Sequence, residues 1–379
     1  MSETKVPSEK SAAPPAPECG YYLNTIYFYL TEGCNLRCRH CWINPPYEGG
    51  AEMKAPCLPL DLFKDIVRQA RPLGMNSIKL TGGEPLIHPE IEAILDFIQG
   101  EKLGLTLETN GVKLTPPLVD KILANPRRFI SVSIDGVDPA THDWVRGVEG
   151  SFEQALEGVR LLVRTGYRPQ LIMSVMKHNA GQMEAVVRLA EREGCASVKF
   201  NLVTPVARGE RLAETGHTLS IGELVRFGEW VERELVPGSK IRVVYSHPAA
   251  FQPLHRLLGA ERSRCGIFGI LGVLGNGKYA LCGIGTTVPE LVFGDARADR
   301  LADVWNRNPI LQELRRGLPA ELKGICADCL NRTFCLASCV ANNYYRHRDL
   351  LAPFWYCEEA FQAGVFPTTR LRPGSPSLP

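Results

Sequence analysis

Short apolar runs alternate with amphipathic segments of helical period from residue 25 to about residue 203. Six of these runs have the length and composition of buried strands: residues 25–30, 77–81, 105–109, 129–135, 170–176 and 197–203. The segments between them include four with apolar side chains three or four positions apart, as helices have: residues 58–70, 88–100, 151–166 and 179–194. Repeated strand–helix units form a parallel sheet with helices packed on its outside. The pattern therefore predicts an α/β fold, a partial (β/α)6 barrel of the TIM type.

The composition argues against several broad classes of function. With 379 residues and 45% hydrophobic content, the chain can bury one large core and a smaller second module. A formal net charge of +2 without a long charged block argues against nucleic acid as a partner. Residues 1–19 contain no apolar signal segment, and no run elsewhere is long enough to span a bilayer. We therefore expect a cytoplasmic protein with no membrane partner.

Thirteen cysteines need an explanation in a chain expected to remain in a reducing compartment, where disulfides rarely form. Cys19, Cys57 and Cys195 stand apart and are explained as ordinary buried or loop thiols. The other ten fall into a triplet that follows the first strand and a set of seven between residues 265 and 357. Their spacing points to metal binding rather than to disulfides.

The triplet Cys34, Cys38 and Cys41 has the spacing Cys-x3-Cys-x2-Cys. Three thiolates on one loop can hold three irons of a [4Fe-4S] cube and leave the fourth iron open to a small molecule. Zinc is the alternative, but structural zinc takes four ligands, usually from two Cys-x2-Cys pairs. His40 could compete as a ligand, yet it directly precedes Cys41 and would have to bend back sharply. The spacing therefore favours an iron-sulfur cluster.

Polar motifs follow the second, third and fourth predicted strands, at the ends where barrel enzymes place their chemistry. Any one of them alone is better explained as a turn, but their recurrence at successive strand ends indicates a binding site. Glu84 can accept hydrogen bonds from an ammonium group, hydroxyl and carboxylate groups suit a ribose, and an arginine suits a carboxylate. The candidate residues are Gly82, Gly83, Glu84 and Pro85 of TGGEP, Asn110 of ETNG, then Ser131, Ser133 and Asp135 of SVSIDG, and Arg146.

The later set of cysteines comprises Cys265, Cys282, Cys326, Cys329, Cys335, Cys339 and Cys357. A pair of zinc knuckles would use four of them and leave three without a role. Two further iron-sulfur clusters would use all seven. The surrounding segment is rich in cysteine and glycine, and a segment of that kind needs metals to stabilise a small core.

From about residue 24 to residue 203, these motifs make the chain resemble the radical S-adenosylmethionine (SAM) superfamily. The resemblance implies that Cys34, Cys38 and Cys41 hold a [4Fe-4S] cluster, which binds SAM and cleaves it reductively to a 5'-deoxyadenosyl radical. It also implies that His40 lies near the adenine and that the segment from Gly82 to Pro85, Glu84 included, holds the methionine ammonium group. Asn110 would contact SAM, Ser133 the ribose or carboxylate, and Arg146 the carboxylate. The proline-rich stretch after Cys41 could form a lid.

From Gly277 to Cys339 the spacing is similar to that of the SPASM extension found in this superfamily. The resemblance implies two auxiliary [4Fe-4S] clusters, the first on Cys265, Cys282 and Cys339, the second on Cys326, Cys329, Cys335 and Cys357. The first set has only three cysteines, so its fourth position is open or filled by another residue, for which His255 is a candidate. The implied organisation is a disordered tail (1–22), a radical SAM barrel (23–215), a helical bridge (216–262), a SPASM domain (263–362) and a flexible tail (363–379).

The family resemblance implies an enzyme that abstracts hydrogen from a ribosomally made peptide or protein and installs a crosslink, thioether, epimerised centre or backbone change. Its expected partners are a separate leader-recognition protein and a flavodoxin or ferredoxin as electron donor. The alternatives are a sulfatase maturase, an enzyme of haem or quinone cofactor synthesis and a non-catalytic iron-sulfur scaffold. A scaffold would leave the TGGEP motif without a function. A hydrogen donor or acceptor is not identified; the candidates are Cys57, Cys195, Tyr245 and Tyr279, and a structural role explains each of them better.

Overall fold

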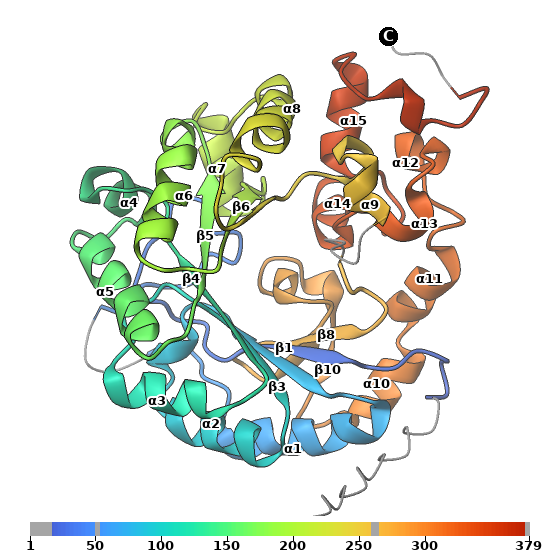
Figure 1. Cartoon of the computed structure of the whole chain (residues 1–379). Helices are drawn as coiled ribbons and strands as arrows, with labels where there is room; N and C mark the ends of the chain where they lie inside the picture. Colours follow the sequence, from blue (N-terminus) through green and yellow to red (C-terminus); the bar gives the residue numbers. More distant parts are fainter. Residues whose placement is uncertain (1–16, 50–53, 259–264, 376–379) are drawn as a thin grey trace, which may run out of the picture.

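A single ten-stranded sheet organises the residues that the computed structural model describes, 17–49, 54–258 and 265–375. Its strands lie in the order β10-β9-β8-β1-β2-β3-β4-β5-β6-β7. The pairs from β1 to β7 are all parallel and follow the chain, which is the topology of a partial barrel. Figure 1 shows the sheet curving, with helices α1, α2, α3 and α5 on its outer side. The predicted fold class is confirmed.

All six predicted strands are present. They are β1 (Thr25–Tyr29), β2 (Ser77–Thr81), β3 (Gly104–Thr109), β4 (Arg128–Ser133), β5 (Gln170–Val175) and β6 (Ser197–Leu202). The connecting helices are α1 (Leu60–Ala70), α2 (Ile91–Gly100), α3 (Pro116–Ala124), α4 (Pro139–Arg146), α5 (Ser151–Arg164) and α6 (Met183–Arg192). The apolar period explains how they pack: in α1, the fully buried side chains are Phe63, Ile66, Val67 and Ala70, which share one face.

A seventh parallel strand lies in the segment from residue 216 to 262, for which the sequence pattern predicted helices alone. The helix α8 (Ile221–Trp230) does begin there, with a capping box between Ser220 and Glu223. It is followed by the strand β7 (Arg242–Tyr245), which pairs with β6. Four residues are too few to reveal a period in the sequence, and the strand is specified by its neighbour. Helix α7 (Arg208–Glu214) precedes this segment, and helix α9 (Leu254–Leu258) is the last element described in it.

The C-terminal part continues the sheet of the barrel. Strand β8 (Ile270–Val273) pairs in parallel with β1, and β9 (Lys278–Ala280) and β10 (Val292–Asp295) follow as antiparallel strands. Short helices complete this part: α10 (Leu301–Arg307), α11 (Pro309–Gly317), α12 (Gly324–Asp328), α13 (Arg332–Cys335), α14 (Val340–His347) and α15 (Trp355–Gln362). In Figure 1 these helices, orange to red, lie on the β8–β10 side of the molecule.

Both terminal segments are more ordered than their compositions suggest. Residues 17–22 were assigned to a disordered tail, but the indole of Trp305 donates to the carbonyl of Tyr21 over 2.8 Å, and Cys19 N–H donates to Asn306. Residues 363–375 were assigned to a flexible tail, but Leu330 N–H donates to the carbonyl of Arg370 over 2.8 Å. Residues 1–16 and 376–379 lie outside the described ranges. Among the described helices, none combines the length and apolar character needed to cross a bilayer.

Candidate active site

The three cysteines of the triplet lie together on the loop that follows β1. Cys34 and Cys38 are buried, Cys41 is partly buried, and all three line a cavity of about 200 Å³ at the C-terminal ends of the strands. The predicted residues Gly82, Gly83, Glu84, Asn110, Ser133, Arg146 and His40 line the same cavity. Pro85 does not; it begins a short 3-10 helix, η2 (Pro85–Ile87), behind Glu84. The sequence motifs thus meet where the barrel topology predicted.

Backbone contacts from two directions hold the cysteine loop in place. The N–H groups of Arg37 and Arg39 donate to the last carbonyls of α4, those of Arg146 and Val145, over 3.0 and 2.9 Å. On the other side, the Arg208 guanidinium donates to the carbonyl of Pro45 over 2.8 Å and to that of Cys38 over 3.4 Å. Arg208 lines the cavity as well, and the sequence motifs did not reveal it. These hydrogen bonds therefore fix the position of the loop between α4 and the start of α7.

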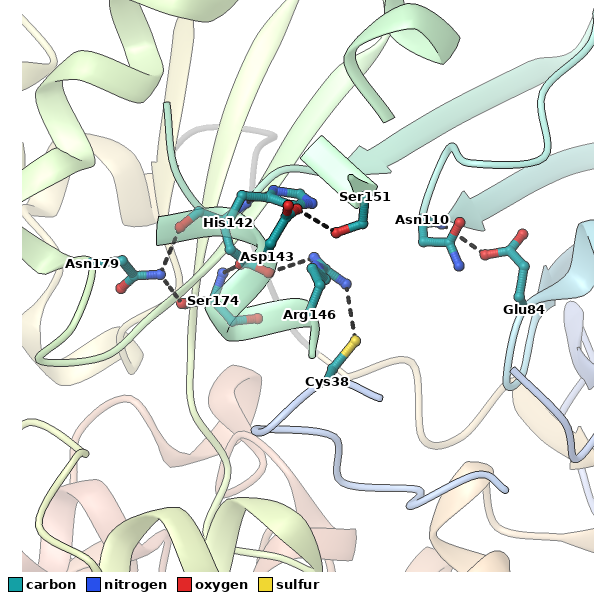
Figure 2. A network of polar contacts seen from close by, with 10 residues as sticks. Cys38, Glu84, Asn110, His142, Asp143, Arg146, Ser151, Ser174 and Asn179 are labelled. Carbon is teal, nitrogen blue, oxygen red and sulfur yellow. Dashed lines mark hydrogen bonds and ion pairs between the residues drawn. The ribbon is translucent and has the colours of Figure 1, made fainter. Parts of the chain in front are cut away.

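Arg146 connects the cysteine loop to a buried carboxylate. Its guanidinium donates to the sulfur of Cys38 over 3.6 Å (Figure 2). It also forms an ion pair of 2.6 Å with Asp135, which is fully buried. Burial alone would raise the pKa of Asp135, but the Arg146 charge holds this pKa below its usual range. Asp135 is therefore committed to Arg146 and not available to a ribose, as its sequence context had suggested. Only Nε of Arg146 lacks a partner among the described residues.

His40 faces this ion pair from the cysteine loop. Burial and the Arg146 charge lower the pKa of His40 to about 4, so its ring is neutral at physiological pH. Its Nδ1 atom is buried and has no hydrogen-bond partner within the described part of the chain. A neutral ring with an open nitrogen at the cavity wall can contact a heteroaromatic base.

The Glu84 carboxylate holds the ends of β2 and β3 together. It accepts hydrogen bonds from Leu86 N–H (3.1 Å), the Thr109 hydroxyl (2.7 Å) and Asn110 N–H (2.7 Å). Burial raises the pKa of Glu84 to about 6. The Asn110 side chain then donates to Asn35 of the cysteine loop over 2.8 Å. Glu84 thus braces the rim of the cavity, in addition to presenting negative charge to it.

Gly82 and Gly83 let the TGGEP turn approach the cysteine loop closely. Gly82 has a φ of 130°, and a Cβ on Gly83 would lie 1.7 Å from the carbonyl oxygen of Gly33. The N–H groups of Gly83 and Glu84 donate to the carbonyls of Thr31 and Gly33 over 3.0 and 3.1 Å. Because a side chain has no room here, both positions require glycine.

The seven later cysteines form two spatial sets. Burial raises the pKa of Cys265, and the neighbouring thiolates Cys339 and Cys282 raise it further. In the same way, burial raises the pKa of Cys357, and Cys326, Cys335 and Cys329 add to the effect. The grouping of the thiols agrees with the SPASM resemblance, and their role as cluster ligands stays a prediction. No disulfide joins any of the thirteen cysteines, all of which the structure describes.

Each donor set consists of cysteine thiols, the ligands that iron-sulfur clusters take. In the described part of the chain, no three acidic, histidine or cysteine side chains converge as the ligands of one metal ion do. A cube spreads its irons over separate corners, so its cysteines stand farther apart than the ligands of zinc. Buried groups of thiols alone, each beside a loop or a cavity, fit such clusters.

Several other candidates do not line the cavity. The side chain of His255 is exposed on α9 near Glu232, and its role as a cluster ligand stays a prediction. The hydroxyl of Tyr245 donates to the Leu224 carbonyl, while Cys195 and Tyr279 are fully buried in the main core. The thiol of Cys57 donates to the carbonyl of Ala55. In the stretch after Cys41, residues 43 and 45 line the cavity mouth, and residues 50–53 are outside the described ranges.

The fold and the site define a radical SAM enzyme with an iron-sulfur extension. Family models agree: the radical SAM superfamily model matches residues 28–190, and the SPASM iron-sulfur cluster-binding domain model matches residues 265–330. The chain therefore belongs to the radical SAM superfamily and carries a SPASM domain, which establishes SAM and [4Fe-4S] clusters as its cofactors.

Relatives from two functional groups span nearly the whole chain. An AdoMet-dependent heme synthase from Methanosarcina barkeri is 29% identical over 348 residues, which are 88% of this chain and 95% of the relative. The mycofactocin maturase MftC from Mycobacterium ulcerans is 25% identical over 351 residues, 91% of this chain and 90% of the relative. The crystal structure of Streptococcus suis SuiB bound to S-adenosylmethionine superposes with a TM-score of 0.68 at 17% identity, covering 89% of this chain and 77% of SuiB. At that identity the likeness establishes the fold.

Proposed function

We propose that this protein modifies a ribosomally made peptide through radical SAM chemistry. The observation that carries the proposal is the single cavity into which the cysteine triplet and the strand-end motifs face together. The peptide class is supported by the mycofactocin maturase, whose similarity covers nine-tenths of both chains. The modification would be a crosslink, a thioether, an epimerised centre or a backbone change.

The chain's own residues would bind and orient SAM. Cys34, Cys38 and Cys41 would hold the first cluster, which when bound supplies the electron that cleaves SAM to methionine and a 5'-deoxyadenosyl radical. Glu84 and the exposed carbonyls of the glycine turn would accept hydrogen bonds from the methionine ammonium group. The neutral ring of His40 would contact the adenine, while Asn110 and Ser133 would hold the polar groups of the rest of SAM.

Arg146 would act differently from the role that the family resemblance implied. Both terminal nitrogens of its guanidinium already contact protein groups, Nη1 the Cys38 sulfur and Nη2 the Asp135 carboxylate, which leaves fewer of its five N–H donors for a SAM carboxylate. We assign Arg146 mainly to positioning Cys38 and to placing positive charge beside the first cluster. A hydrogen bond to a ligating sulfur and a nearby cation both tune the potential of an iron-sulfur cluster.

Two auxiliary [4Fe-4S] clusters would occupy the two later cysteine sets and receive the electron that remains after the new bond forms. Cys265, Cys282 and Cys339 would bind the first, with an open or non-cysteine fourth position. Cys326, Cys329, Cys335 and Cys357 would bind the second. We further propose a cytoplasmic protein, a flavodoxin or ferredoxin as electron donor and a separate leader-recognition protein.

The shape of the open space supports an extended substrate. A second cavity of about 270 Å³ shares Tyr29, Ile43, Pro45, Gly82 and Gly83 with the first one. It runs toward the β8–β9 hairpin and is lined there by Asn276 and Lys278. Two adjoining cavities with polar groups along their walls fit a chain that carries backbone donors and acceptors.

The second candidate function is synthesis of a haem-type tetrapyrrole. It is favoured by the heme synthase from Methanosarcina barkeri, whose 29% identity extends over 95% of its length. The two candidates share SAM cleavage and differ in the molecule that loses a hydrogen atom.

Formation of 5'-deoxyadenosine tests the shared chemistry. The anaerobically reconstituted protein should release it from SAM with a strong reductant, and the Cys34→Ala, Cys38→Ala, Cys41→Ala triple variant should not. Equal release from both proteins would refute radical SAM catalysis.

Mass spectrometry separates the two substrates. A peptide encoded beside the gene should lose two hydrogens or take up solvent deuterium in the presence of enzyme and SAM. If that peptide is unchanged while an added haem precursor changes its absorption spectrum, the tetrapyrrole function replaces the peptide function.

A further inference from the structure

The inner face of the barrel carries charged side chains that the binding of SAM does not explain. Strand alternation places Ile78 and Leu80 of β2 in the core toward the helices, and Lys79 on the opposite face. Lys79 lines the cavity together with Glu108 of β3. Glu108 belongs to ETNG, but its place inside the barrel was not visible in the sequence motif.

Lys79 and Glu108 form an ion pair of 2.7 Å that is partly open to the cavity. The side chains are 20% and 34% exposed, respectively. The ammonium group of Lys79 also lies 4.8 Å from the ring centroid of Tyr27, on the neighbouring strand β1. This pair alone is neutral and would require no counter-charge from a ligand.

A second lysine on the same face makes the group cationic. In the sheet register, Ser133 of β4 pairs with Ile172 of β5, and Ile172 pairs with Lys199 of β6. Residues in one register row point to the same face, so Lys199 faces the side on which Ser133 lines the cavity. Lys199 is partly buried and has no ion pair among the described residues.

The electrostatics agree with this placement. Burial and the Lys79 charge lower the pKa of Lys199, whereas the Glu108 charge raises it. Among these three side chains, two ammonium groups lie beside one carboxylate, so the group carries a net charge of +1. A partly buried cation of this kind is stabilised by an anionic ligand.

We propose that Lys79, Glu108 and Lys199 form a subsite for a carboxylate group of the substrate. The subsite rests on the proposed function, because it takes the barrel interior as the substrate side of the SAM site. In a peptide, the ligand is the side chain of an Asp or Glu residue, or a C-terminal carboxylate. The carboxylate would bind between Lys199 and Lys79 and fix which carbon of the substrate lies near the cavity.

Protection of Lys199 from acylation tests the subsite without turnover. The reconstituted full-length protein is treated with an amine-reactive acetyl ester, and the modification of each lysine is measured by peptide mass spectrometry. N-acetylglutamate amide should protect Lys199, while N-acetylglutamine amide at equal ionic strength should not. Lys240, which is exposed on the surface, is the internal control and should react equally in both cases.

Two further additions distinguish the source of the carboxylate. If SAM or methionine protects Lys199 as well as N-acetylglutamate amide does, the charge serves the cofactor and the subsite proposal is overturned. Equal protection by the glutamate and glutamine probes, or none by either, overturns it too. Because no product is measured, this result is independent of whether the peptide-modification proposal holds.

Variants that remove a positive or a negative charge should change the affinity for the probe in opposite directions only if the subsite binds an anion. By calorimetry, Lys199→Met should weaken binding of N-acetylglutamate amide by about tenfold, and Glu108→Gln should strengthen it because a repelling carboxylate is removed. A merely structural role would make both variants bind more weakly, which would contradict the proposal. Lys240→Met is the matched control and should bind the probe as the parent protein does.

Discussion

The guanidinium of Arg146 donates a hydrogen bond to the sulfur of Cys38, and this contact joins the end of α4 to the cysteine loop. The arginine is almost fully buried, and its charge is balanced by Asp135 on the far side. A buried cation at this position affects the stability of the barrel and, if Cys38 ligates the first cluster as proposed, the properties of that cluster. The consequences of the two roles differ and can be measured separately.

Arg146→Met should lower the free energy of unfolding of the cluster-free protein by about 3–5 kcal/mol, because it leaves Asp135 buried without its partner. Chemical denaturation monitored by circular dichroism measures this change. The double variant Arg146→Met, Asp135→Asn should recover part of the loss, since no isolated charge remains. Additive losses in the double variant would show that the ion pair is not the cause.

Stability should depend on the ionisation of Glu84. Burial raises the pKa of its carboxyl group to about 6 in the folded protein, above the ordinary value of 4.5. The folded state therefore binds this proton more tightly than the unfolded state does. Through this proton, Glu84 contributes about 2 kcal/mol to stability. The contribution is complete below pH 4.5 and is lost as the pH rises through 6.

The Glu84→Gln variant isolates this contribution. Denaturation curves for the parent protein and the variant should be measured from pH 4 to pH 7.5, and their difference should change by about 2 kcal/mol in favour of the variant. A difference that stays constant over this range would mean that Glu84 titrates normally. The Gln side chain also points an NH2 group toward a backbone N–H donor. We therefore expect the variant to lose, in addition, the same amount of free energy of unfolding at every pH.

Gly83→Ala should destabilise the protein by at least about 3 kcal/mol, because the new methyl group would collide with the Gly33 carbonyl. It should also prevent the glycine turn from approaching the cysteine loop, so SAM binding measured by calorimetry should be lost. Gly100→Ala at the end of α2 is the matched control. Its Cβ meets nothing within 4 Å, and this variant should be neutral or slightly stabilised.

Iron content should report three separate clusters. The reconstituted parent protein is expected to contain about twelve irons, and Cys357→Ala about eight if the second auxiliary cluster is lost. Iron and sulfide analysis, combined with electron paramagnetic resonance, measures both. Cys195→Ala is the control: Cys195 is fully buried in the main core, and its removal should leave the iron content unchanged. A parent protein that saturates near four irons would contradict the assignment of both auxiliary sets.

Much of the fold was predictable because strand and helix periods are local properties. Short apolar runs placed β1 to β6 correctly, and cysteine spacing separated the triplet from the seven later cysteines. Strand β7 was missed because four residues give no readable period, and the pairing of β8 with β1 joins residues that are far apart in the chain. Residues 17–22 look disordered by composition, but Trp305 orders them through a contact that only the folded chain provides.

In the site, motifs at the ends of strands revealed residues such as Glu84, Asn110 and Ser133, but not Lys79 and Glu108 within β2 and β3. TGGEP and the triplet have recognisable spacing, whereas Lys79 and Glu108 are single polar residues within apolar strands. The signal for them is a charged side chain at the inward position of a strand such as SIKLT, between two buried residues. Asp135 was misassigned to a ribose because its partner, Arg146, belongs to another element and only tertiary structure brings the two together.

The pairing of β8 with β1 makes the distance between the cluster sites a property of one sheet. The loop with the cysteine triplet leaves the C-terminal end of β1, and Cys265 and Cys282 flank β8 and its hairpin with β9. Strands that share backbone hydrogen bonds move together, so a cluster held by Cys265 and Cys282, as proposed, would not move toward or away from the cysteine triplet. The path for electron transfer between them would therefore have a fixed length, and its rate would be set by the fold rather than by domain motion.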